Sequence, residues 1–352
     1  MNPKAIIATI VTVAALVIRP AVAKACTCMA PVKTCGVLTG AASVLEATVD
    51  SIRLVPSPIP QAALASGAAS FSTFSNDVRV VTLRDVKAWR GAGSTTVITA
   101  RDSASCGYEF EIGTRYLIVA DAATGGHLAV SRCGLTRRLS EAQGLIDYIR
   151  LLGATGSRPP IRVWGQVMRA TRWIDFTREY TGVADARVTL DGATRRSIRT
   201  GPDGRFVAAD LPPGRYRATV TAPSPLPLGR SRPWDFELGA TSATACLELD
   251  FVVPIESSIS GVVVDERGQP VRGVFVRLHL PDQRDYSRGW AGGGYTTDAL
   301  GRYEFKDLPP GRYAIGLHEP GDPAPATIVS LRLGERLILQ PLIVRRPSSH
   351  SR

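Results

Sequence analysis

The sequence has few of the residues on which most enzyme and metal sites depend. Its four histidines are never within four residues of one another: His127, His279, His318 and His350. No H-E-x-x-H, G-x-S-x-G or P-loop motif occurs, and no G-x-G-x-x-G follows a strand-like segment. The sequence therefore predicts a protein that is not an enzyme and that uses no cofactor or bound metal.

Long apolar runs are also absent, with one exception. Residues 5–18 read AIIATIVTVAALVI, follow Lys4, and precede the small residues of 21–25. As a helix this run is about 21 Å long, which is short for a hydrocarbon core of about 30 Å. The pattern predicts a signal peptide over residues 1–25 that is cleaved on export, leaving no membrane span in the mature chain.

Acidic residues are in the minority, and the positive charge is thinly spread. The net charge is +11, and loss of residues 1–25 removes three basic residues and no acidic one, which leaves +8. No run of basic residues is longer than two, and none is interleaved with aromatic residues. A solvated basic surface, with no nucleic-acid partner, is the interpretation that this pattern favours.

The heptapeptide DLPPGRY occurs twice, at 210–216 and at 307–313. In each copy the second proline presets φ, and we expect the glycine after it to adopt a positive φ, as in a type II turn. The turn then directs the tyrosine that starts the next strand toward one face of a sheet. The residues given this structural role are Pro213, Gly214 and Tyr216 in the first copy and Pro310, Gly311 and Tyr313 in the second.

The heptapeptide is part of a repeat of about 95 residues, in which 200–220 aligns without gaps on 297–317. Alternating segments and tight turns predict β-strands throughout. The pattern resembles the carboxypeptidase regulatory-like domain, a seven-stranded transthyretin-like β-sandwich. The second copy carries the motif in full, at Gly261, Thr297, Asp298, Gly301, Tyr303 and 308–313. The first has Gly201 and Phe206 at two motif positions and a longer first loop, 168–182. We expect sandwiches over 161–253 and 254–347, and a short tail, 348–352.

The amino-terminal part has a different pattern. Strands are predicted at 44–55, 78–91, 95–100, 115–122 and 127–131, and a helix, capped by Ser140, at 140–153. Cys26-Thr27-Cys28, VKAWRG, SCGYEFEIGTRYLIVA and Cys133-Gly134 resemble the netrin-like module, also called the tissue-inhibitor-of-metalloproteinases-like domain. That resemblance implies an OB-type barrel over 26–153, followed by a linker at 154–160. The expected fold class is mainly β.

The six cysteines are an even number, which in an exported chain predicts disulfides and a periplasmic, cell-surface or secreted location. The netrin-like resemblance implies the pairs Cys26–Cys106 and Cys28–Cys133. Cys35 has no family partner, and Cys246 lies in another domain. A Cys35–Cys246 bond that tethers the two domains and a pair of free thiols both remain open.

The predicted function is non-catalytic: extracellular binding, adhesion or scaffolding, with a protein or glycan partner. One alternative is inhibition of an extracellular metalloprotease. In the inhibitors that the barrel resembles, the terminal cysteine chelates the protease zinc and the next residue enters the specificity pocket; here these are Cys26 and Thr27. A second alternative is glycan binding through loops that display aromatic side chains. The aromatic residues concerned are Trp234, Tyr286, Trp290 and Tyr295.

Overall fold

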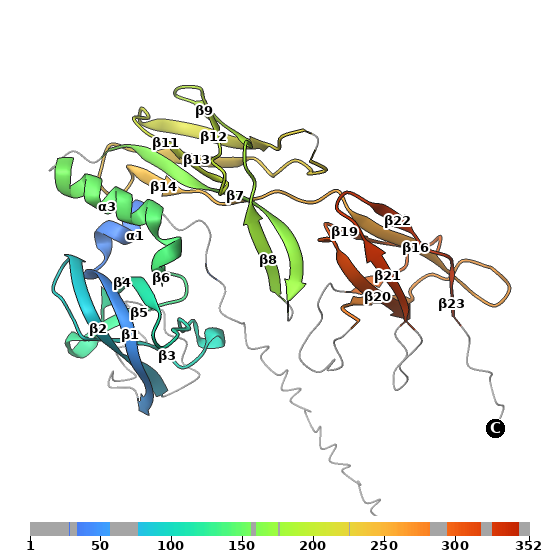
Figure 1. Cartoon of the computed structure of the whole chain (residues 1–352), viewed down its shortest axis with the longest axis horizontal. Coiled ribbons are helices and arrows are strands. Elements are labelled where there is room, and N and C mark those ends of the chain that lie inside the picture. Colours follow the sequence, from blue (N-terminus) through green and yellow to red (C-terminus); the bar gives the residue numbers. More distant parts are fainter. Residues whose placement is uncertain are drawn as a thin grey trace, which may run out of the picture.

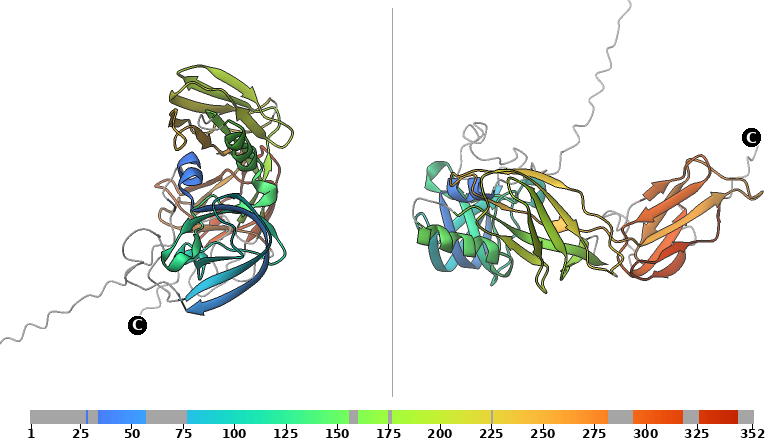
Figure 2. Two further views of the ribbon diagram at one scale, coloured as in Figure 1. Left: turned by 90° about the vertical axis from the view of Figure 1, so that its left-hand side faces the viewer. Right: turned by 90° about the horizontal axis from the view of Figure 1, so that it is seen from above.

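The computed structural model describes residues 28, 34–56, 77–155, 160–174, 177–224, 226–281, 294–317 and 326–344. Three β modules follow one another along an elongated molecule, and the second sandwich lies at the end away from the barrel (Figures 1 and 2). The predicted signal peptide 1–25, most of the linker 154–160 and the tail 348–352 lie outside the described residues. No described helix is long and apolar enough to cross a membrane.

The first module is a closed five-stranded barrel. Its strands are β1 (Ser43–Pro56), β2 (Asp77–Arg90), β3 (Thr96–Ala100), β4 (Arg115–Ala122) and β5 (Leu128–Val130). The order is β1–β2–β3–β5–β4, and β4 pairs with β1, which closes the sheet. β3 and β5 run parallel, and the other neighbours are antiparallel. The predicted OB-type barrel is confirmed, and its five strands lie where the sequence placed them.

The two longest strands of the barrel bend around it with the help of bulges. β1 and β2 are 14 residues each, and their register shifts three times along the pair. At one shift Asp85 adopts a φ of +53°. Bulges let a strand bend more sharply than an even ladder would allow, so these two strands can close a small barrel.

Two helices cover one end of the barrel. The helix α3 (Gln143–Thr155) is the one predicted from periodicity, but it begins after Ser140 rather than next to it. A short 3-10 turn over Leu139–Glu141 takes up the residues between, so the expected cap is wrong. The helix α1 (Thr34–Gly40) was not predicted, since seven residues carry no helical period. A two-residue strand, β6 (Arg137–Arg138), joins the barrel at β4.

The first sandwich has two sheets that enclose one apolar core. One sheet runs β10 (Arg196–Arg199), β9 (Arg187–Gly192), β12 (Gly214–Thr221) and β13 (Trp234–Leu238). The other is built on β7 (Arg162–Ile174), with β11 (Arg205–Ala208), β14 (Cys246–Glu248), β15 (Phe251–Val252) and β8 (Thr177–Gly182). The loop predicted at 168–182 is instead the β7–β8 hairpin, which extends from the sandwich (Figure 1).

The second sandwich repeats this plan without the hairpin. One sheet runs β18 (Gly294–Thr296), β17 (Phe275–His279), β20 (Gly311–Leu317) and β21 (Thr327–Leu331). The other joins β16 (Ser258–Val264) to β19 (Arg302–Lys306), β22 (Arg336–Ile338) and β23 (Leu342–Ile343). In both copies the last two short strands run parallel to the first strand of the sandwich. The two β-sandwiches expected from the sequence are therefore confirmed, with nine strands described in the first and eight in the second.

The DLPPGRY turn has its tyrosine where the sequence predicted, but its backbone differs. Tyr216 and Tyr313 are buried, and their hydroxyls donate to the carbonyls of Pro212 and Pro309 at 2.7 and 2.6 Å. The residue with left-handed φ is the leading aspartate, Asp210 at +53° and Asp307 at +55°. Gly311 does not have a positive φ, and Gly214, at +151°, is far from the value a type II turn requires. The type II assignment for Pro213-Gly214 and Pro310-Gly311 is therefore wrong, and in both copies the tyrosine hydroxyl bonds back to the first proline of the turn.

Candidate functional site: the junctions between modules

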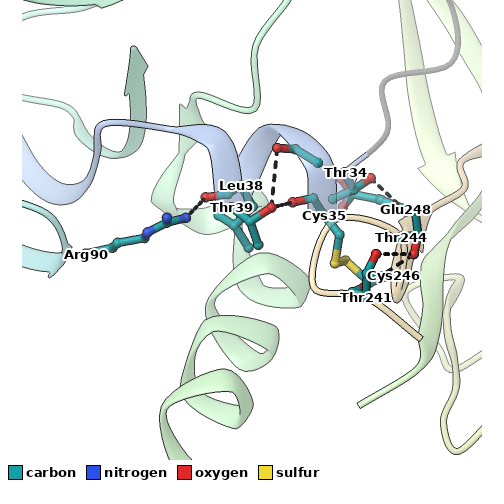
Figure 3. The surroundings of a disulfide bond; sticks show 10 residues. Thr34, Cys35, Leu38, Thr39, Arg90, Thr241, Thr244, Cys246 and Glu248 are labelled. Carbon is teal, nitrogen blue, oxygen red and sulfur yellow. Dashed lines mark hydrogen bonds between the residues drawn. A yellow bond between two sulfur atoms is a disulfide. The ribbon is translucent and has the colours of Figure 1, made fainter. Parts of the chain in front are cut away.

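The barrel and the first sandwich are joined by a disulfide. Cys35 of α1 is bonded to Cys246 of β14, with Cα atoms 5.2 Å apart and 211 residues between them in sequence (Figure 3). Both cysteines are almost fully buried. Of the two alternatives that the sequence left open, the tether between domains is the one present. The described residues contain no free cysteine.

A glutamate beside the disulfide connects three elements. The Glu248 backbone N–H donates to Thr34 Oγ1 at 3.0 Å, which ties β14 to the start of α1 (Figure 3). The Glu248 carboxylate accepts from both terminal nitrogens of Arg137, at 2.9 and 2.8 Å, and from Trp164 Nε1 at 3.1 Å. Charge-assisted, bidentate bonds of this kind fix orientation as well as distance. Glu248 thus holds β6, β7 and α1 in one geometry.

Trp164 also forms the apolar part of this junction. Its ring stacks on Tyr148 of α3 with centroids 5.3 Å apart, and burial raises the pKa of Tyr148 to about 12. A Cβ at Gly144 would lie 2.4 Å from the Trp164 ring, so only glycine allows α3 to approach this closely. Trp164 and Cys246 belong to the same apolar cluster as the covered end of the barrel. The barrel and the first sandwich therefore share a core.

An open cleft of about 500 Å³ lies next to the junction, between α3 and the outer face of β7 and β11. Its ionisable residues include Glu141 and Asp147 from the barrel side, and Arg205 and Asp250 from the sandwich. Asp250 Oδ1 accepts from the Gln166 backbone N–H at 2.9 Å. Desolvation, and then the charge of Glu248, raise the pKa of Asp250.

One of the acids that line the cleft is already engaged in the junction. The Glu248 carboxylate accepts from Arg137 and from the Trp164 N–H. Among the described residues no group of three or more histidines, cysteines or acids is placed to hold a metal.

The junction between the two sandwiches has no disulfide among the described residues, and it is formed by a few side-chain contacts. Arg178, at the tip of the β7–β8 hairpin, forms an ion pair with Asp307 at 2.5 Å. The other Asp307 oxygen accepts from the Ile255 backbone N–H, in the connection between the sandwiches, at 2.8 Å. Trp173 packs against the core of the second sandwich, with the Arg178 guanidinium 4.8 Å from its ring. The second DLPPGRY turn thus serves as a contact between modules through its aspartate.

The residues predicted to form disulfides divide in two groups. Cys28 and Cys133 are bonded, which is the pairing that the netrin-like resemblance implies. Cys106 is disulfide-bonded too, and its implied partner, Cys26, lies outside the described residues. Thr27, the predicted pocket residue of an inhibitor, is also outside them. The inhibitor hypothesis therefore stays a prediction.

Of the four aromatic residues predicted to line binding loops, the structure describes two, and these lie in different sandwiches. Trp234 lies in strand β13 of the first sandwich, half-buried against its core. Tyr295 lies in strand β18 of the second, 40% exposed and edge-on to Phe305. Both were predicted in loops. For Trp234, the alternation of apolar and polar residues in WDFEL was the missed signal. Tyr286 and Trp290 lie outside the described residues.

Sequence reasoning missed the residues of the barrel junction: Arg137, Tyr148, Trp164 and Glu248. The aligned copies offered one usable signal. The strand registers place Trp164 opposite Glu248 and Ser260 opposite Ile338, so these are equivalent pairs in the two sandwiches. The first copy has a tryptophan and a glutamate at these outward positions, where the second has serine and isoleucine. This difference indicates that the outer face of the first sandwich contacts another part of the protein.

Comparisons with known proteins identify one part of the chain. Residues 258–339 match the family model described as the carboxypeptidase regulatory-like domain. A comparison with curated proteins finds no match. The matched segment covers the second sandwich, and the motif residues Gly261, Thr297 and Tyr303 lie within it. The second sandwich is therefore identified as a carboxypeptidase regulatory-like domain.

Solved structures show only a distant likeness. The chain is 12% identical to GBS52, the minor pilin of Streptococcus agalactiae, over 54% of this chain and 99% of that one, with a TM-score of 0.22. The Bacillus anthracis TIE protein is 13% identical, over 87% of this chain and 52% of its own, with a TM-score of 0.25. The shaft pilin SpaA of Lactobacillus rhamnosus GG is 12% identical, over 54% and 98%, with a TM-score of 0.22. Likenesses at these scores carry no argument about function.

Proposed function

We propose that this chain is an exported, non-catalytic scaffold that holds three β modules in a fixed order and presents their surfaces to a partner outside the cytoplasm. The observation that carries this proposal is the barrel junction, where a buried disulfide, a bidentate ion pair and an aromatic stack act on the same few residues. A junction of this kind keeps the surfaces of two modules at a constant separation, which multivalent binding requires.

The disulfides also support an extracytoplasmic location. Cys35–Cys246 and Cys28–Cys133 link segments that are 211 and 105 residues apart. Bonds of this type persist in oxidising compartments and are rare in reducing ones. Export, the periplasm or cell surface as destination, and a netrin-like origin of the barrel are parts of the same proposal.

The test measures whether the oxidised full-length protein is retained on envelope and secreted material from the cell that produces it. Wild type and Asp250→Asn are compared, because Asp250 is the cleft acid whose pKa is raised. We expect equal, saturable retention and bound material that is chemically unaltered, as read by mass spectrometry. If wild type cleaves or modifies the bound material and Asp250→Asn does not, the protein is an enzyme and the proposed scaffold function is wrong.

Two narrower functions remain separate predictions. Metalloprotease inhibition requires Cys26 as the mature amino terminus, which intact-mass measurement of the secreted protein determines. Glycan binding through aromatic display predicts that Trp234→Ala and Trp290→Ala abolish retention on polysaccharide. The packing of Trp234 against the core of the first sandwich favours a structural role for that residue.

A further inference from the structure

Part of the outer face of the β16 sheet in the second sandwich is apolar, although the neighbouring strand β19 directs Arg302, Glu304 and Lys306 to the same face. Ile338 is 79% exposed and Ile343 is 59% exposed. The register pairs Ile338 with Ser260 and Ile343 with Val264, so these four side chains share a face, and Val262 lies between the two on β16. We call these five residues the β16 face. Alternate residues of β16, Ile259 and Val263, are buried in the core instead.

A sheet with one solvated face normally alternates apolar and polar residues, and strands that are apolar on both faces belong to sheets that are covered on both. The segment Gly261–Val264 reads GVVV, and Val262 and Val264 are directed outward. Scattered apolar residues on a surface need no explanation, but a contiguous group across three strands does. The β16 face therefore has the pattern of a surface that is covered in use.

The first sandwich shows what covers the equivalent surface. By register, Ser260 corresponds to Trp164, Ile338 to Glu248, and Ile343 to Val252. Trp164 lies against α3, at Gly144 and Tyr148, and Glu248 binds the start of α1 through Thr34. Val252 is not covered and stays 44% exposed, so within this chain helices dock on the part of this face around Trp164 and Glu248.

We propose that the β16 face is a docking site for the apolar side of an amphipathic helix in a partner protein. This inference rests on the proposed scaffold role, and it names the kind of partner. In the first sandwich a large side chain on the sheet, Trp164, meets a glycine on the helix. In the second the sheet has the small Ser260, so the partner helix must supply a large apolar side chain at that point. Ile338 replaces Glu248, so the contact needs no buried ion pair.

The rim of the β16 face favours a helix of opposite charge. Arg302 pairs with Val262 across the sheet, and its side chain is exposed, whereas Lys306 is already bonded to Glu304 at 2.9 Å. An acidic residue beside the apolar side of the helix would complement Arg302. A second copy of the chain would instead bring two Arg302 side chains to one contact, which opposes self-association through this face.

The test uses a helical probe patterned on this chain. The probe is a fluorescein-labelled, side-chain-stapled peptide of residues 143–155 in which leucine replaces Gly144. Binding to the oxidised full-length protein is followed by fluorescence anisotropy. We expect saturable binding, at least tenfold weaker for Ile338→Glu and for Ile343→Glu, because either carboxylate would be desolvated under the helix. Both sites are exposed in the free protein, so both variants fold.

The matched control is Val252→Glu, which makes the same change at the equivalent position of the first sandwich and leaves probe affinity unaltered. Absence of saturable binding to wild type, or equal binding by Ile338→Glu, overturns the proposal. A concentration-dependent dimer in sedimentation that Ile338→Glu abolishes also overturns it, since the occupant is then a second copy. If wild type does not bind the probe but is still retained on envelope material, the docking proposal fails and the proposed scaffold function stands.

Discussion

The two junctions of this molecule join three modules of similar size by different means. Between the barrel and the first sandwich, the disulfide Cys35–Cys246 (Figure 3) acts together with the Glu248–Arg137 pair and the Trp164–Tyr148 stack. Between the two sandwiches, the contacts include the Arg178–Asp307 pair, the packing of Trp173 and the close approach of Gly334 to Pro227. The first junction shares one apolar cluster between modules, whereas the second brings a hairpin tip to the edge of a separate core.

The difference indicates where the molecule bends. A shared core and a covalent bond leave no low-energy way to separate the barrel from the first sandwich. An ion pair that is partly open to solvent contributes little by comparison. We infer that the barrel and the first sandwich move as one body, and that the second sandwich changes its orientation about the connection near Ile255.

The largest effect is expected from removing the covalent part of the first junction. In Cys35→Ala/Cys246→Ala, loss of a bond that closes a loop of 211 residues should lower the free energy of unfolding by about 3–5 kcal/mol. Urea unfolding measures this loss, and pulsed EPR between labels on the barrel and the first sandwich measures the broadening of their separation. Cys28→Ala/Cys133→Ala is the matched control: it weakens the barrel but leaves that separation unchanged. Equal distance distributions in all three proteins would contradict the single-body interpretation.

A smaller loss is expected when the disulfide is kept and the ion pair beside it is broken. Glu248→Ala leaves Arg137 and the Trp164 N–H without their acceptor at a site where both charged side chains are less than a quarter exposed. Because this pair is not fully buried, removing one partner should cost less than in a fully buried pair, about 2–3 kcal/mol. Thermal unfolding compared with Glu237→Ala provides the control, since Glu237 faces Arg215 in an ion pair that is largely open to solvent. A similar shift for both variants would mean that Glu248 does not organise the junction.

The strands of the barrel and of both sandwiches were predictable because each carries its own alternation, and the repeated segment supplied the register twice. The junction was not predictable, because its residues are far apart in sequence: Glu248 lies 111 residues from Arg137 and 84 from Trp164. No local pattern reports a contact of that kind. The hairpin at 168–182 was missed for a different reason, since alignment on the second copy makes any extra segment look like a loop.

The repeat itself offers the cleanest comparison for the second junction. Asp307 and Asp210 occupy the same turn position with the same left-handed backbone, yet Asp307 binds Arg178 and Ile255 whereas Asp210 is exposed. Asparagine tolerates this backbone, so Asp→Asn changes the charge alone. Asp307→Asn should cost about 1 kcal/mol and broaden the distance distribution between the two sandwiches. Asp210→Asn should do neither, and equal effects would show that the turn, not the ion pair, fixes the joint.

The smallest expected effect concerns the cleft beside the first junction, where the folded protein raises the pKa of Asp250 through desolvation and the nearby Glu248 charge. Between the ordinary carboxyl pKa of 3.8 and the raised value, the folded state binds more protons than the unfolded state. The free energy of unfolding therefore falls as the pH rises through that window, and the penalty persists at neutral pH. Asp250→Asn keeps an acceptor for the Gln166 N–H and removes the charge, so it should be more stable than wild type at pH 7 and equal to it below about pH 4. Urea unfolding across this range checks the difference, with Asp210→Asn as the control for loss of one charge.

The contradicting outcome is a difference in the free energy of unfolding between Asp250→Asn and wild type that is the same at every pH. It would mean that ionisation of Asp250 does not act on the junction, and that the cleft is as open to solvent as the turn at Asp210.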